Sequence, residues 1–290
     1  MKNCSNKEAL CTATLVRNGT YSRISDRKRL VRWRCPKCGK SYSNAAQNPC
    51  FNQKKRQLNG IIFNLINSNT SFRRIARILK ISRLTVIRKK DFLSSLNLKK
   101  HELYLKSLSQ NQLSDIQIDE METHIHTKCK PVSIAIAVSA HSRKILAFEV
   151  STFRPKHPAL AKKSRKKYGF RADTRTEGFE TLLLKIAHVV HPLATLTSDE
   201  KSIYGPRIKK ILPGRTHICV KSRKAIIAGQ GELKEGGYDP LFSLNHTCAM
   251  IRANMNRLNR RTWCTSKTIA GLIAHLNLYM HYHNSVLTPA

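Results

Sequence analysis

Carboxylates are scarce in this sequence, with 17 Asp and Glu against 53 Lys and Arg, yet three of them gather within four residues. Asp119, Glu120 and Glu122 lie at the end of residues 115–119, whose alternating polar and apolar side chains are typical of a strand with one buried face. Carboxylate oxygens are the ligands that hard divalent cations prefer. The sequence therefore predicts a metal site where this first strand ends.

A second strand ends in a carboxylate in the same way. Residues 193–199 form a short apolar strand that ends at Asp199 and follows an amphipathic helix, which Thr174 and Glu177 could cap. A strand reached through a helix is expected to pair in parallel, so Asp199 can lie beside Asp119. Two such carboxylates could hold metal ions for phosphoryl transfer. Alternatively, each aspartate only binds the amides of a turn.

Other segments must position these carboxylates. Residues 132–138 and 144–150 are apolar runs joined by a polar turn, which predicts a hairpin covered by helices. Residues 242–261 repeat apolar side chains at intervals of four and three, which predicts a further helix. Asn245 falls in the first turn of that helix, where a third metal ligand would be expected.

Cysteines indicate a different metal. Cys35 and Cys38 form a C-x-x-C-G-K turn, which is typical of structural zinc sites. Cys4 and Cys11 are spaced more widely and are the expected second pair, although Cys50 could replace either of them. A basic hairpin is expected between the pairs, as in a zinc ribbon. The alternative is that these cysteines are free, partly buried thiols.

Residues 57–91 have the pattern of a helix-turn-helix. An apolar stripe over residues 58–66 predicts a first helix, residues 71–79 a second, and Ser82 could cap a third. The third helix would enter the major groove of DNA. Its candidate DNA contacts are Arg83, Thr85, Arg88, Lys89 and Lys90. The alternative is a solvated basic bundle that reads no groove, and residues 96–112 are interpreted as a linker with some helical character.

Charge identifies the class of partner. The formal net charge is +36, and residues 1–100 carry 24 basic and only 3 acidic side chains. The mutual repulsion of so many positive charges is tolerated when the partner is a polyanion, which indicates a nucleic acid. Residues 154–175 form a basic loop in which Lys162, Lys163 and Arg165 could follow a nucleic-acid backbone, or could simply be solvated. The sequence has no run of 18 apolar residues and no signal-peptide core, so we expect neither membrane insertion nor secretion.

Three stretches carry a resemblance to a known family. With the expected zinc ribbon and helix-turn-helix before them, DEMETHIH from Asp119, TLTSDEKSIY around Asp199 and LNHTCAMIRANMNRLNRRTWCTSKT from Leu244 resemble bacterial insertion-element transposases of the insertion-sequence-one type. The resemblance covers nearly the whole chain. It implies an α/β fold with a ribonuclease-H-like mixed sheet flanked by helices, and a DDE-class enzyme that cuts and joins double-stranded DNA with Mg²⁺ or Mn²⁺.

By this resemblance, Asp119 and Asp199 match the two family aspartates, and Asn245 stands where the family has glutamate. The amide of Asn245 could be a weaker ligand, Glu232, Glu235 or Asp239 could contribute instead, or the protein is a catalytically silent DNA-binding remnant or repressor of element ends. Arg252, Arg257, Arg260 and Arg261 of the same helix could clamp a phosphate.

The implied organisation is a zinc ribbon (residues 1–52), a helix-turn-helix (53–95), a linker (96–112) and a catalytic domain (113–290). The expected partners are the terminal repeats of the element, target DNA and further copies of the chain, with the protein associated with the nucleoid in the bacterial cytoplasm.

Overall fold

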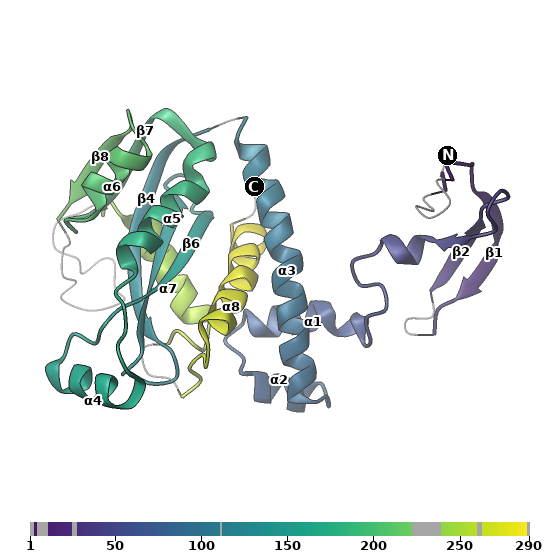
Figure 1. Ribbon diagram of the computed structural model, residues 1–290, viewed down its shortest axis with the longest axis horizontal. Helices are drawn as coiled ribbons and strands as arrows, with labels where there is room; N and C mark the ends of the chain where they lie inside the picture. Colours follow the sequence, from purple (N-terminus) through teal and green to yellow (C-terminus); the bar gives the residue numbers. More distant parts are fainter. Residues whose placement is uncertain are drawn as a thin grey trace. The chain divides into compact units, whose positions relative to one another are not determined.

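The computed structural model describes residues 3–4, 11–24, 28–110, 112–221, 239–259 and 263–288. The chain divides into two compact units, residues 1–62 and 63–290, and the boundary falls within helix α1 (Asn59–Ile66). This division differs from the expected one, because the helices of residues 72–108 belong to the same unit as the large sheet. Figure 1 shows the elements of each unit.

The first unit is built on a small antiparallel sheet. Strands β1 (Val16–Ser22), β2 (Arg29–Arg34) and β3 (Ser41–Ser43) pair in that order. Two short 3-10 helices follow, η1 (Asn44–Gln47) and η2 (Arg56–Leu58). The pairing of β1 with β2 is the hairpin expected between the two cysteine pairs.

A mixed five-stranded sheet forms the centre of the second unit, in the order β6-β5-β4-β7-β8. Strand β5 is antiparallel to β4 and β6, whereas β7 is parallel to both β4 and β8. The bounds of the strands are β4 (Leu113–His124), β5 (Pro131–Ser139), β6 (Ile145–Thr152), β7 (Val190–Asp199) and β8 (Thr216–Val220). The predicted α/β class and the hairpin of β5 and β6 are therefore confirmed.

Helices cover both faces of this sheet (Figure 1). Helices α5 (Arg175–Ile186) and α6 (Tyr204–Ile211) share a core with Ile116 and Ile118 of β4. Helices α7 (Phe242–Asn254) and α8 (Ile269–Tyr282) share a second core with Met121. Successive side chains of a strand point to opposite faces, so one strand supplies both cores. The predicted capping box of α5 does not form, because the Thr174 hydroxyl accepts a hydrogen bond from the backbone N–H of Thr152 at 3.0 Å.

Helices α2 (Phe72–Ile78) and α3 (Arg83–Leu108) begin where the sequence predicts. The hydroxyl of Ser71 accepts from the backbone of Arg74, and that of Ser82 accepts from the backbone of Leu84. The helical character expected of the linker extends over most of it, because α3 continues to Leu108, so these residues are part of a long helix rather than a linker. Its inner face packs on α8, where Asn277 donates to Ser94 at 3.3 Å.

The remaining elements are short. Helix α4 (Pro158–Tyr168) lies within residues 154–175, so half of the expected basic loop is helical. A 3-10 turn η3 (Ala187–Val189) joins α5 to β7, and a short π-helix η5 (His283–Leu287) follows α8. No helix in the described parts of the chain combines the length and the apolar character needed to cross a membrane.

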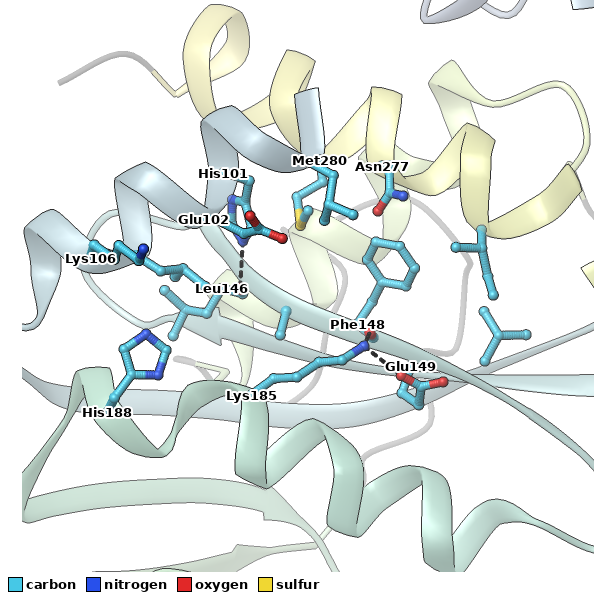
Figure 2. A pocket seen from close by; sticks show the side chains of 15 residues that line it. His101, Glu102, Lys106, Leu146, Phe148, Glu149, Lys185, His188, Asn277 and Met280 are labelled. Carbon is cyan, nitrogen blue, oxygen red and sulfur yellow. Dashed lines mark hydrogen bonds and ion pairs between the residues drawn. The ribbon is translucent and has the colours of Figure 1, made fainter. Parts of the chain in front are cut away.

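Strand β6 is an edge strand, and side chains occupy its open side. The imidazole Nε2 of His101 donates to the carbonyl oxygen of Leu146 at 2.7 Å, and Lys185 Nζ donates to that of Phe148 at 3.3 Å (Figure 2). Lys185 also pairs with Glu149 at 2.6 Å, beside a pocket of about 440 Å³. Because exposed edge strands pair readily with other chains, these contacts protect the sheet from unwanted pairing.

Candidate functional site: a four-cysteine centre and paired aspartates

Four cysteines of the first unit converge. The sulfur atoms of Cys4, Cys11, Cys35 and Cys38 all lie within 4.8 Å of one another, and the Cys4–Cys38 and Cys11–Cys35 pairs are 3.6 Å apart. Zinc bound tetrahedrally at about 2.3 Å from four sulfurs would separate them by about 3.8 Å. The four cysteines could therefore hold a zinc ion, as predicted.

The local backbone explains this geometry. The amide N–H of Cys38 points at the sulfur of Cys35 at 3.4 Å, and that of Gly39 donates to the carbonyl oxygen of Cys35 at 3.0 Å. Gly39 has φ of +71°, a conformation that glycine adopts without a steric penalty. Cys50 is not a member of the cluster, and its sulfur accepts a hydrogen bond from Asn59 at 3.4 Å. The second pair is therefore Cys4 and Cys11.

In the second unit, Asp119 and Asp199 occupy neighbouring positions on parallel strands. The register of β4 with β7 pairs Ile118 with Ser198, and each aspartate is the next residue on its strand. Because Ile118 faces α5 and α6, the two aspartates face the side covered by α7 and α8. The expected parallel pairing is confirmed, although β7 pairs with β4 rather than with β6, which precedes it in the sequence.

The environment of Asp119 favours its protonated form. Burial raises the pKa of Asp119 to about 6, and the charges of Asp199 and Glu120 add to this effect. The backbone N–H of Glu120 donates to Asp119 Oδ1 at 2.6 Å and opposes the shift, as does the charge of Lys201. Two carboxylates that repel one another in a partly buried place are a setting in which a divalent cation is favoured.

The expected cluster of Asp119 with Glu120 and Glu122 does not form. Strand β4 continues to His124, so Asp119 lies inside the strand, and the pleat turns the two glutamates to the opposite face. There, Glu120 is paired with Lys201 at 2.6 Å and accepts a hydrogen bond from Ser133. Glu122 is paired with Lys156 at 2.7 Å. Neither glutamate is therefore a partner of Asp119 at a metal.

The third predicted ligand lies on the expected helix but has another partner. Asn245 is exposed in the first turn of α7, and its amide donates to Asp239 at 2.9 Å rather than to either aspartate. Cys248, one turn further along, is the α7 residue close enough to Asp119 for that charge to raise its pKa, in addition to the larger effect of burial. Glu232 and Glu235 lie outside the described residues.

The predicted DNA contacts divide into exposed and buried residues. Arg83 and Arg88 are exposed, and Thr85 is half-buried. Lys89 and Lys90 are only 4% exposed, so the prediction that they contact DNA is wrong. Both lie on the inner side of α3, where Lys90 follows Val86 by one turn and pairs with Asp91 at 2.7 Å.

Other predicted basic contacts lie further along the chain. Lys162, Lys163 and Arg165 are exposed on α4. Arg252 is half-buried at the end of α7, and Arg260 and Arg261 lie outside the described residues.

Two residues that help to shape the aspartate site, Gln117 and Lys201, were not identified from the sequence. The side chain of Gln117 donates to the carbonyl oxygen of Pro240 at 2.8 Å and accepts from the N–H of Leu244 at 2.9 Å, which fixes the start of α7 near Asp119. Lys201 donates its backbone N–H to Asp199 at 3.3 Å while its ammonium group holds Glu120. Lys201 follows Asp199 by two residues, and this spacing was the only signal in the sequence.

Among the described residues, the four cysteines are the only group of three or more His, Cys, Asp or Glu whose ligand atoms all lie within 4.8 Å of one another. Among these residues, Asp119 and Asp199 therefore have no third His, Cys, Asp or Glu ligand beside them. Neither the protein-family models nor the curated proteins compared with this chain match it.

Proposed function

We propose that the protein is a DNA transposase of the DDE class, which binds the ends of an insertion element and catalyses metal-dependent strand cleavage and strand transfer. The observation that carries this proposal is the pair Asp119 and Asp199, placed side by side on the face covered by α7. Two carboxylates in this arrangement can hold Mg²⁺ or Mn²⁺, which would activate the attacking oxygen and stabilise the leaving one.

The topology supports the same proposal. A strand order of β6-β5-β4-β7-β8, in which only β5 runs against the others, is the arrangement expected of a ribonuclease-H-like sheet. In such a fold the first and fourth strands of the sheet would carry the two aspartates, and these are β4 and β7. A helix further along the chain would supply the third ligand, and α7 begins against Gln117, two residues before Asp119 on the same face.

The basic surfaces are proposed to bind double-stranded DNA. Helices α2 and α3 would act as the helix-turn-helix, with exposed arginines directed at the groove and its phosphates. These are Arg73, Arg74, Arg77, Arg83 and Arg88. Exposed Lys162, Lys163 and Arg165 of α4 extend the positive surface. Assembly of several copies on two element ends, in the nucleoid of a bacterial cytoplasm, belongs to the same proposal.

A catalytically silent DNA-binding protein is the second candidate, and one observation favours it. Asn245 is neutral and its amide is engaged by Asp239, so the site has one negative charge fewer than a site with three carboxylates. If the protein is a transposase, the Asn245 side chain must break its hydrogen bond to Asp239 and turn its oxygen toward the metal. In the silent reading, the pair of Asn245 and Asp239 simply fixes the first turn of α7.

A strand-transfer assay separates the two candidates. Linear DNA carrying the terminal repeats is incubated with a supercoiled target plasmid and Mg²⁺ or Mn²⁺. A transposase joins the donor 3′ ends to the plasmid, and Asp199→Asn abolishes joining while retaining the gel shift of the donor DNA. A wild-type protein that shifts the DNA but yields no joined product with either metal would favour the silent candidate.

A further inference from the structure

A second basic pocket lies away from the aspartate pair. It has a volume of about 390 Å³ and is formed by the starts of α2, α3 and α8 and by residues 256–257 and 263–268. Its lining includes the side chains of Arg83, Asn256, Arg257, Trp263 and Lys267.

The pocket gathers positive charge. Arg73, Arg83, Arg257 and Lys267 are among its lining residues, and in the part of the chain that the structure describes no Asp or Glu lines it. Lys90 also lines the pocket, but it is buried and its charge is paired with Asp91. Arg257 is held with its guanidinium 4.1 Å from the centre of the Phe72 ring and donates to the carbonyl oxygen of Thr265 at 3.3 Å. Burial and the nearby charge of Arg83 lower the pKa of Arg257. Cations held together against their repulsion form a site for an anion.

Helix α8 adds to this field. It begins at Ile269 after Thr268, whose hydroxyl accepts from the backbone N–H of Gly271 at 3.1 Å, and both Thr268 and Gly271 line the pocket. The first turn of a helix carries a partial positive charge and unpaired N–H groups, which favour a phosphate. Helix α8 therefore supports the same ligand as the side chains.

Two further residues indicate that the ligand has more than a phosphate. Asn256 is 7% exposed, and its side-chain oxygen is buried without a hydrogen-bond partner, although buried acceptors are nearly always paired. Trp263 is fully exposed, although it lines the pocket. An acceptor that needs a donor and an uncovered indole suit a nucleobase, which offers N–H groups and a flat face for stacking.

We propose that this pocket binds one nucleotide of a DNA strand whose base has left its stack, with the phosphate against Arg83, Arg257 and Lys267 and the base on Trp263. The inference rests on the proposed function only in taking DNA as the source of the nucleotide. A free nucleoside phosphate offers the same chemistry, so the experiment compares the two sources.

The fluorescence of Trp263 provides the readout. The chain has two tryptophans, so the full-length Trp33→Phe variant leaves Trp263 as the only one. It is titrated with a ten-residue oligothymidylate, with thymidine monophosphate, with inorganic phosphate and with a blunt duplex. We expect the oligothymidylate to quench Trp263 emission at lower concentration than the mononucleotide, and phosphate alone not to quench it. Tighter binding of the mononucleotide than of the oligothymidylate would overturn the assignment to a DNA strand.

Two variants locate the interaction in the pocket. Trp263→Ala removes a side chain that is wholly exposed, so the fold should not change, and it should weaken oligothymidylate binding roughly 5- to 150-fold, the equivalent of one stacked base. Lys267→Gln should flatten the plot of log affinity against log salt by about 0.7. Lys99→Gln removes the same charge from an exposed position of α3 outside the pocket and should leave the slope unchanged.

The outcomes separate this inference from the proposed function. If the blunt duplex binds but the oligothymidylate neither quenches Trp263 nor depends on it, the pocket inference fails and the DNA-binding proposal stands. If the oligothymidylate quenches Trp263 but duplex DNA with the terminal repeats does not bind specifically, the pocket stands and the transposase proposal fails.

Discussion

Asp119 and Asp199 lie one pairing step beyond Ile118 and Ser198 on adjacent parallel strands, and the charge of Asp199 contributes to raising the pKa of Asp119 to about 6. Burial is the larger cause of this shift. The protein therefore holds an ionised Asp119 at neutral pH at a cost in stability, and strongly perturbed carboxylates of this kind are common at functional sites.

The first prediction concerns stability and pH. The folded-state pKa of Asp119 is raised from 3.8 to about 6, so between these values the folded protein binds more protons than the unfolded chain. The free energy of unfolding should then fall as pH rises through this window, by at most about 3 kcal/mol. Without added Mg²⁺ or Mn²⁺, Asp119→Asn should be more stable than the wild type at pH 8 and nearly equal to it near pH 4. Urea denaturation at the two pH values measures this, and an Asn variant that is less stable at pH 8 would contradict it.

The second prediction concerns the metal. Mn²⁺ or Mg²⁺ should raise the melting temperature of the wild type, because a cation that binds only the folded state stabilises it. Asp119→Asn and Asp199→Asn should each lose most of this increase. Asp115→Asn is the matched control, because Asp115 lies on β4 but is engaged by Ser114 and His141. An equal loss in the control would show that the effect is general charge screening.

The third prediction concerns zinc. Full-length protein should contain one zinc per chain, and Cys38→Ser should lose it and destabilise residues 1–62, because metal binding and folding are coupled in small cysteine sites. Cys50→Ser should keep the metal, since Cys50 lies outside the cluster. Metal analysis by mass spectrometry decides between these outcomes. Retention of zinc in Cys38→Ser would refute the four-cysteine site.

The fourth prediction uses the two kinds of basic residue on α3. Arg88→Gln should reduce the dependence of log affinity on log salt by about 0.9 and leave stability nearly unchanged, because Arg88 is exposed. Lys90→Gln should leave the salt dependence unchanged and lower the stability, because Lys90 is buried and paired with Asp91. Salt-dependent fluorescence anisotropy and thermal melts of both variants measure the difference. An unchanged slope for Arg88→Gln would place the DNA interface elsewhere.

The fifth prediction concerns Asn245. A glutamate at this position adds the missing charge, so Asn245→Glu should strengthen Mg²⁺ binding and maintain or raise cleavage, whereas Mn²⁺ should support the wild type better than Mg²⁺. Asn245→Ala measures the contribution of the amide, including its hydrogen bond to Asp239. If Asn245→Glu abolishes a measurable activity that Asn245→Ala retains, the third ligand lies elsewhere.

The sequence predicted β4 to β7, the hairpin of the first unit, the grouping of the four cysteines and the position of Asp199 beside Asp119, because each depends on short-range patterns, but it did not predict β3 or β8. Alternation marks β4, the C-x-x-C spacing marks the turn at Cys35, and an intervening helix favours parallel pairing. Ser71 and Ser82 likewise marked the starts of α2 and α3 through their capping hydroxyls.

What the sequence missed depends on contacts between distant segments. The buried face of α3 carries Lys90, Ser94, Asn97 and His101 between the apolar Val86, Leu93 and Leu105, so its burial against α8 and β6 leaves only a weak apolar periodicity. The sequence pattern ends β4 at Asp119, which would bring Glu120 and Glu122 beside it, whereas the strand continues to His124. The hydrogen bond from Asn245 to Asp239 depends on the shape of the turn before α7, which no local sequence pattern predicts.

Single-turnover cleavage of DNA carrying the terminal repeats, with Asp119→Asn beside Asp115→Asn, tests the proposed activity most directly. In Mn²⁺ we predict that Asp115→Asn cleaves at nearly the wild-type rate, whereas Asp119→Asn is slower by about three orders of magnitude, on the order of 4 kcal/mol, with its gel shift unchanged. Cleavage by Asp119→Asn at the wild-type rate would contradict the assignment of the catalytic metal to the aspartate pair.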